Sequence, residues 1–135
     1  KLLRVTSRPY IFSASIPASV AAGLSQSIRI IMRDRSFRDQ LFNNIEYFQK
    51  LLSGSKIPFI GSFRTPIIPI VIGDELRTIK ISKDLYKKGF FIPPVIWPAV
   101  PKGKARLRIT LMNHHTKSQL ELLVSTLNRL CEEIN

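Results

Sequence analysis

The segment from residue 98 to residue 111 (PAVPKGKARLRITL) constrains the fold of this chain more than any other. A loop with prolines and a glycine leads into a strand, and side chains alternate between the two faces of a strand. One face of this strand is apolar and carries Leu107, Ile109 and Leu111. The opposite face is polar and carries Arg106, Arg108 and Thr110. This pattern is typical of a half-buried antiparallel strand, whose apolar face must be covered by other elements.

Helical patterns on both sides of this strand indicate what covers it. Apolar residues recur at intervals of three and four from Val20 to Leu52, which predicts a long amphipathic helix with a bend near Asp34–Ser36. A final helix is predicted after Thr116, because Thr116 and Gln119 form a capping-box pattern ahead of an apolar stripe.

Between these helices, strands and a helix alternate. An apolar strand is predicted at 67–72, where Pro69 argues for a sheet edge or a bulge. Asp74 can cap a helix that ends at Gly89, and a short strand is predicted to begin at 90–92. We therefore expect an α+β domain: a three- to four-stranded, mainly antiparallel sheet with helices on one face, preceded by the long helix.

Arg106 and Arg108 have two interpretations on this evidence. Two guanidiniums beside a rigid loop can bind a carboxylate or a phosphate through paired hydrogen bonds. They can also simply line the solvent face of the strand, and strand chemistry alone favours that second interpretation. His114 and His115 are adjacent but have no Cys, Asp or Glu cluster beside them, so we expect a structural or turn role and no metal site.

The charge of the chain is unusual. Of its 135 residues, 21 are lysine or arginine and 9 are acidic, and the resulting net charge of +12 attracts polyanions. The basic residues are nevertheless scattered, and we expect no basic region with exposed aromatic residues interleaved. A solvated basic surface, with no specific nucleic acid as partner, is the simpler interpretation. A polyanion- or nucleic-acid-binding module and a structural dimerisation domain are the alternatives.

The cysteine content and hydropathy bear on the cellular compartment. Cys131 is the only cysteine, so an internal disulfide is excluded. We find no apolar run long enough to cross a bilayer and no signal-peptide pattern at the start of the sequence. These features predict a reducing, cytoplasmic compartment and no transmembrane segment.

Three segments in the right order and spacing resemble a known family. They are residues 8–17 (RPYIFSASIP), 65–74 (TPIIPIVIGD) and 98–116. Together they resemble the C-terminal part of the α-oxoamine synthases, which include 8-amino-7-oxononanoate synthase and serine palmitoyltransferase. These pyridoxal-phosphate enzymes condense an amino acid with an acyl thioester and release carbon dioxide. The resemblance implies the small C-terminal domain of fold type I pyridoxal-phosphate enzymes.

The resemblance also assigns roles to particular residues. It implies that Arg108 holds the carboxylate of the amino acid substrate and that Arg106 is secondary. It implies that Ser13 or Ser15 reaches the cofactor phosphate of a neighbouring subunit, which requires a homodimer. The acyl donor would be an acyl-CoA or acyl-carrier thioester. Without the resemblance, both serines would be interpreted as helix-capping residues.

The same comparison indicates what lies outside this chain. Such enzymes are longer than 135 residues, and their cofactor lysine lies upstream of the segment that residues 8–17 resemble. We therefore expect residues 1–15 to be an extended segment leading from a missing large domain, and residues 16–135 to form the small domain. No catalytic residue is expected in the fragment, which should be inactive alone. Residues 96–99 (IWPA) stand where biotin-pathway members show RPPT, which argues against that pathway. Residues 98–101 (PAVP) and 115–117 (HTK) more closely resemble the serine palmitoyltransferase branch.

Overall fold

The computed structural model describes residues 2, 6, 16–61 and 65–132. The chain divides into two compact units, Lys1–Arg35 and Ser36–Asn135. In the first unit, helix α3 spans Ala18–Arg33, and none of its residues is buried. An apolar stripe on this helix is formed by Val20, Leu24, Ile28 and Ile31, all largely exposed.

The long helix that the sequence predicts is two helices. Helix α3 ends at Arg33, and α4 spans Ser36–Ser53. Asp34 takes an extended conformation with φ −117° and ψ 108°, which ends the helical hydrogen-bond ladder. The predicted bend near Asp34–Ser36 is therefore a break, and the division between the two units falls at the same place.

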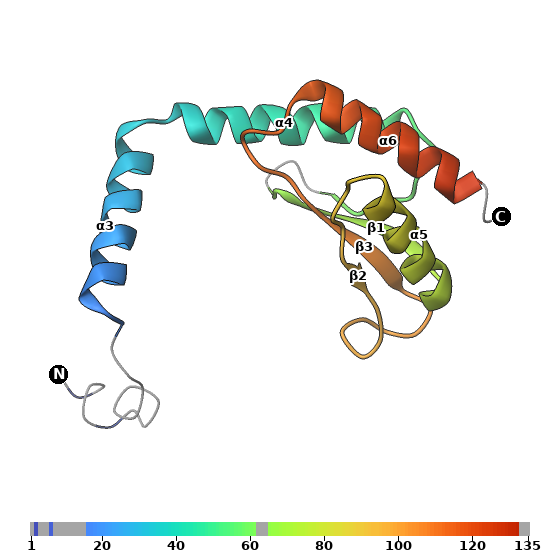
Figure 1. Ribbon diagram of the computed structural model, residues 1–135, viewed down its shortest axis with the longest axis horizontal. Coiled ribbons are helices and arrows are strands. Elements are labelled where there is room, and N and C mark those ends of the chain that lie inside the picture. Colours follow the sequence, from blue (N-terminus) through green and yellow to red (C-terminus); the bar gives the residue numbers. More distant parts are fainter. Residues whose placement is uncertain (1, 3–5, 7–15, 62–64, 133–135) are drawn as a thin grey trace. The chain divides into compact units, whose positions relative to one another are not determined.

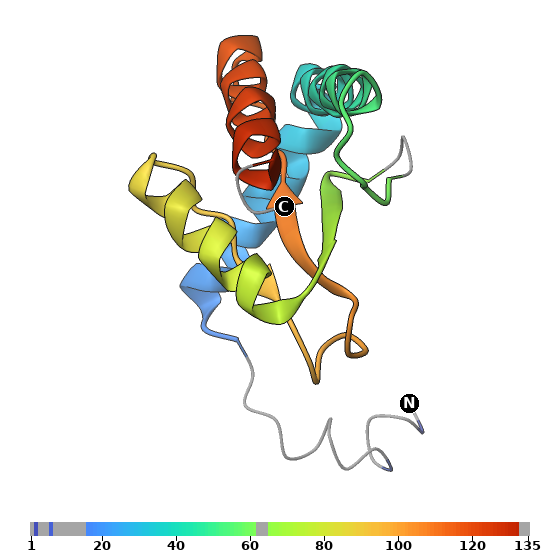
Figure 2. The same ribbon diagram turned by 90° about the vertical axis from the view of Figure 1, so that its right-hand side faces the viewer.

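The second unit is an α+β domain (Figure 1). After α4 the chain forms β1 (Ile67–Gly73), α5 (Glu75–Lys87), β2 (Pro94–Val95), β3 (Ala105–Thr110) and α6 (Lys117–Glu132). The three strands are ordered β1-β3-β2, and both neighbouring pairs are antiparallel. Helices α4, α5 and α6 lie on one side of this sheet (Figure 2). The predicted fold class is confirmed.

Cross-strand pairing sets the apolar face of the sheet against the helices. Ile68 lies opposite Ile109, and Ile70 lies opposite Leu107; all four are buried. The helices complete the core with Ile45, Phe48 and Leu52 from α4, Ile81 and Leu85 from α5, and Leu120, Leu123, Val124, Leu127 and Leu130 from α6. Full burial of an aliphatic side chain contributes about 1.5–3 kcal/mol, so this interface is the main source of the domain's stability.

Local capping signals set where helices α5 and α6 begin and where α5 ends, as predicted. The Asp74 carboxylate accepts a hydrogen bond of 2.7 Å from the Arg77 backbone N–H and caps α5. Gly89 follows the helix with φ +88°, a conformation that favours glycine. The capping box before α6 is present: Gln119 Oε1 accepts from the Thr116 N–H, and Thr116 Oγ1 accepts from the Gln119 N–H.

Strand β2 begins later than the sequence suggests. It spans Pro94–Val95, whereas a strand was expected to start at 90–92. The Ser82 hydroxyl of α5 donates a 2.6 Å hydrogen bond to the Ile92 carbonyl, which holds this segment against the helix. Pairing with β3 starts only at Pro93, whose carbonyl accepts from the Arg108 N–H at 3.1 Å.

Asn44 of α4 fixes the turn between β3 and α6. This side chain is almost fully buried, and its amide nitrogen lies 2.9–3.2 Å from three carbonyl oxygens. Those carbonyls belong to Met112, Asn113 and His115. One buried amide thus holds the chain where it leaves the sheet and turns into α6.

We predict that Asn44→Ala destabilises the domain. Removing a buried amide that donates to three backbone carbonyls costs about 1–3 kcal/mol, so the free energy of unfolding should fall by that amount. Urea denaturation followed by circular dichroism measures it. Asn43→Ala is the matched control, since Asn43 is exposed on the same helix and its removal should cost about 0.5 kcal/mol or less. Equal effects of the two substitutions would contradict the role given to Asn44.

Candidate functional site

The sheet face opposite the helices carries the two arginines of β3. Arg106 lies between Val71 of β1 and Val95 of β2 in the pairing register. Arg108 lies opposite Pro69. The residues paired with the two arginines are therefore apolar and half-buried. The guanidiniums are the charged groups on this part of the sheet face. The alternation read from the sequence is confirmed: both arginines project from the same face.

The two guanidiniums have different surroundings. Arg106 is half-buried, and its Nε donates a 3.1 Å hydrogen bond to the Lys104 carbonyl, which directs the group back along the strand. Arg108 is exposed, and in the part of the chain that the structure describes its guanidinium has no hydrogen-bond or ion-pair partner. Arg108 therefore has its full set of donors available for an anionic ligand.

The loop from β2 to β3 is ordered by its own contacts. The Trp97–Pro98 peptide bond is cis, and the Ala99 N–H donates to the Ile96 carbonyl at 3.0 Å. Lys102 Nζ lies 5.4 Å from the centre of the Trp97 ring, within the range of a cation–π interaction. This loop adds the charges of Lys102 and Lys104 beside the strand that carries the arginines.

Ser13 and Ser15, the predicted cofactor-binding residues, lie outside the described residues. The segment 1–15, expected to be extended, is described only at residues 2 and 6. The roles of these serines stay predictions.

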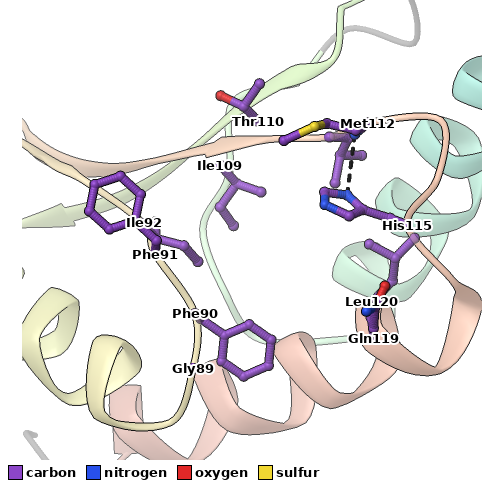
Figure 3. Close-up of a pocket in the computed structure, with 11 residues that line it drawn as sticks. Gly89, Phe90, Phe91, Ile92, Ile109, Thr110, Met112, His115, Gln119 and Leu120 are labelled. Atoms are coloured by element: carbon purple, nitrogen blue, oxygen red, sulfur yellow. Dashed lines mark hydrogen bonds between the residues drawn. The ribbon is translucent and has the colours of Figure 1, made fainter.

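A pocket of about 360 Å³ lies where β3 runs into the turn before α6 (Figure 3). Apolar residues form most of its lining: Phe90, Ile92, Ile109, Leu111, Met112 and Leu120. His115 lies at one side, and its Nδ1 accepts a 3.2 Å hydrogen bond from the Met112 backbone N–H. Because Nδ1 is an acceptor, the proton of the neutral ring is on Nε2, which points into the pocket in Figure 3.

His115 therefore has the turn role that the sequence suggested. Partial burial, with a smaller contribution from the charge of His114, lowers the pKa of His115 below its ordinary value of 6.5. The neutral ring is the form that can accept from Met112, so the pKa shift and the hydrogen bond favour the same protonation state.

The basic surface includes two exposed aromatic residues. The sequence predicts no exposed aromatic residues of the base-stacking type among the basic ones, and this stays a prediction; Tyr86 and Phe91 are 68% and 82% exposed, with their rings edge to face. They adjoin Lys83 and Lys87 around one shallow depression. Tyr86 stands within the lysine-rich helix and Phe91 only two residues after its capping glycine. This closeness in sequence to the lysines of α5 could have indicated that the two aromatic residues lie on the basic surface.

Comparison with known proteins now identifies the family. The model for aminotransferase class I and II matches residues 1–127. The chain belongs to this family. Among curated relatives, the 8-amino-7-oxononanoate synthase of Alkaliphilus oremlandii is 38% identical over 129 residues, covering 95% of this chain and 32% of that protein. The Treponema denticola enzyme of the same name is 34% identical, with 98% and 32% covered.

Solved structures in this aminotransferase family share the fold. Serine palmitoyltransferase from S. paucimobilis, with PLP and myriocin bound, is 25% identical and superposes with a TM-score of 0.88 over 98% of this chain and 33% of its own. An 8-amino-7-oxononanoate synthase from Francisella tularensis, at 19% identity, shows the same fold with a TM-score of 0.80. The resemblance drawn from the sequence is confirmed. Both curated relatives above are 8-amino-7-oxononanoate synthases, so the preference for the serine palmitoyltransferase branch stays a prediction. The chain spans about a third of the length of these proteins.

The described part of this aminotransferase-family chain contains no helix that is long and apolar enough to span a membrane.

We predict that His115 makes the domain less stable at acidic pH. Well above pH 6.5 the ring is neutral in both the folded and the unfolded chain. As the pH decreases below 6.5, the unfolded chain binds the proton more readily than the folded chain, because the pKa of His115 is lower in the folded chain. The free energy of unfolding therefore decreases as the pH is lowered. Thermal denaturation between about pH 7 and about pH 5 measures this slope.

His115→Gln should flatten that pH dependence, because glutamine does not titrate. His114→Gln is the matched control and should change the slope much less than His115→Gln, because the charge of His114 makes only the smaller contribution to the pKa shift of His115. An unchanged slope in His115→Gln would contradict this assignment.

Proposed function

We propose that this chain is the small C-terminal domain of a pyridoxal-phosphate-dependent α-oxoamine synthase, which condenses an amino acid with an acyl thioester and releases carbon dioxide. The observation that carries the proposal is that 8-amino-7-oxononanoate synthases and a serine palmitoyltransferase both match nearly the whole chain. Both names belong to one reaction class, so the class is common to the relatives although their substrates differ.

Arg108 is the proposed anchor for the substrate carboxylate. Its guanidinium is exposed on the open face of the sheet, above apolar neighbours, which supports a role in binding an anion from outside this domain. A guanidinium binds a carboxylate through two parallel hydrogen bonds, which fixes orientation as well as position. Loss of carbon dioxide needs the bond to the carboxylate held at a defined angle, and a rigid strand supplies that geometry. Arg106, already bonded to Lys104, has the secondary role.

The residues of this chain fit the cofactor in part. Pyridoxal phosphate, when bound, accepts the electron pair that develops at the substrate Cα. Among the residues that the structure describes, neither arginine of β3 has an acidic partner, which suits the anionic substrate rather than the cofactor ring. Ser13 and Ser15 are the proposed ligands of the cofactor phosphate, and hydroxyls beside a helix N-terminus suit that group. We propose that the cofactor lysine is supplied from a preceding large domain.

Assembly and compartment follow from the same proposal. If Ser13 or Ser15 reaches the phosphate of a neighbouring subunit, the complete enzyme is a homodimer with shared sites. Its acyl donor is an acyl-CoA or acyl-carrier thioester, and both donors are polyanionic, in keeping with the net charge of +12. Burial raises the pKa of the Cys131 thiol and favours its protonated form. The proposed compartment is the cytoplasm.

We predict that Arg108→Ala in the complete enzyme weakens amino acid binding and slows condensation. Losing a charge-assisted pair that substrate binding desolvates costs about 2–5 kcal/mol. Arg108→Lys should recover only part of the activity, because an ammonium group lacks the planar fork. Titration of the cofactor absorbance with amino acid, together with steady-state kinetics, measures both effects.

Arg106→Ala is the control for this prediction, since it removes the same charge from the same face. It should be milder than Arg108→Ala, and neither variant should lose the cofactor. Normal kinetics in Arg108→Ala, with binding lost in Arg106→Ala, would mean that the register of the carboxylate site is wrong.

A second prediction concerns the shared site. A variant lacking the cofactor lysine and a variant carrying both Ser13→Ala and Ser15→Ala should each be inactive or weakly active alone. When the two are mixed into heterodimers, one of the two sites regains every required residue, so activity should partly return. Purified heterodimers without any recovered activity would contradict the placement of the serines in a neighbouring subunit.

A further inference from the structure

The solvent face of α5 carries a basic–aromatic surface that the proposed reaction does not use. We define this surface by Leu76, Lys80, Lys83, Tyr86, Lys87, Lys88 and Phe91. Four of these residues are spaced by four, three and four positions, so they form one stripe along the helix: Leu76, Lys80, Lys83 and Lys87. The aromatic residues stand at the C-terminal end of that stripe. All seven residues are exposed.

The apolar members protrude into solvent. Leu76, Tyr86 and Phe91 are 78%, 68% and 82% exposed, although aromatic and leucine side chains are usually covered. The Tyr86 and Phe91 rings contact each other edge to face, with centroids 6.4 Å apart. Beside them lies an apolar depression of about 440 Å³ that Ile92, Pro93 and Pro94 help to line. The apolar area is therefore continuous from Tyr86 into the segment before β2.

The surface is strongly positive. It carries Lys80, Lys83, Lys87 and Lys88, and Asp84 lies among them, so these five residues together have three net positive charges. Lys87 Nζ lies 2.8 Å from the Asp84 carboxylate. The hydrogen bond from Lys87 and the charges of Lys80 and Lys88 lower the pKa of Asp84, so this group stays ionised and neutralises only one lysine. The remaining ammonium groups are directed to solvent.

We propose that this basic–aromatic surface binds the surface of an anionic lipid bilayer, with Tyr86 and Phe91 inserted at the level of the headgroups. Exposed aromatic rings flanked by lysines suit this environment, because the rings enter the apolar boundary while the long lysine side chains reach the phosphates. Charge complementarity is the supporting argument: a polybasic surface gains affinity from anionic headgroups with each lysine. The protein would lie on the membrane by this one face.

Two features favour lipid over nucleic acid. The edge-to-face contact of Tyr86 with Phe91 uses ring area that successive bases would need for stacking. Asp84 stands among the lysines, where it would oppose a continuous track of backbone phosphates. A bilayer makes neither demand, since its headgroups rearrange around a fixed pattern of charges.

The test is vesicle flotation of the full chain. One set of vesicles contains phosphatidylcholine alone, and the other also contains about one third phosphatidylglycerol. The chain should float with the anionic vesicles only, and raising the salt concentration should release it. Lys80→Ala with Lys83→Ala should weaken binding by about fivefold for each lysine. Phe91→Ser should weaken binding while leaving its salt dependence unchanged, because it removes no charge.

A matched control separates this surface from the net charge of the chain. Lys50→Ala with Lys56→Ala removes the same charge from α4 and the loop after it, and should leave vesicle binding nearly intact. Circular dichroism confirms that the variants, all at exposed positions, remain folded. An equal loss in the control, or no flotation of the unmodified chain, overturns the proposal. So does binding of an oligonucleotide or an acidic carrier protein, but not of vesicles, that the Lys80 and Lys83 substitutions abolish.

Discussion

The pairing of β1 with β3 is the constraint on which the rest of the structure depends. This register places Ile68 against Ile109 and Ile70 against Leu107, facing the three helices. Because side chains alternate along a strand, the same register places Arg106 and Arg108 on the open face. A shift of one residue would bury both guanidiniums and expose the apolar residues. The core and the proposed carboxylate site are thus consequences of a single strand alignment.

The sheet is small, and side-chain hydrogen bonds hold the segments that its strand pairing and apolar core do not fix. β2 contributes only two residues, so the segments that flank the sheet are held by side chains of the helices. Asn44 of α4 holds the turn that leaves β3, and Ser82 of α5 holds the segment that enters β2. His115 closes the same turn from within, through the Met112 N–H. Strand β3, which carries Arg108, is therefore fixed at the end where it leaves the sheet.

Two surfaces of the domain carry positive charge of different character. On the open face of the sheet, Arg106 and Arg108 are planar donors held by a rigid strand, an arrangement suited to one small carboxylate. On α5, Lys80, Lys83 and Lys87 are flexible point charges beside exposed rings, an arrangement suited to an extended anionic surface. The two proposed roles, selective binding of a carboxylate and attachment to an anionic surface, thus depend on different kinds of basic side chain.

Local periodicity and capping chemistry were enough to predict most elements of this protein. The α6 capping box, the Asp74 cap and the alternation of β3 depend on residues a few positions apart, so the sequence alone determined them. The family resemblance added the proposed role of Arg108, which stays a prediction. Contacts between distant segments were decided only by the tertiary structure. Ser82 delays the start of β2, Asn44 spans 68 residues or more to reach the turn, and Phe91 stays uncovered beside the lysines. Burial and long-range hydrogen bonds depend on which surfaces meet, and no local pattern specifies that.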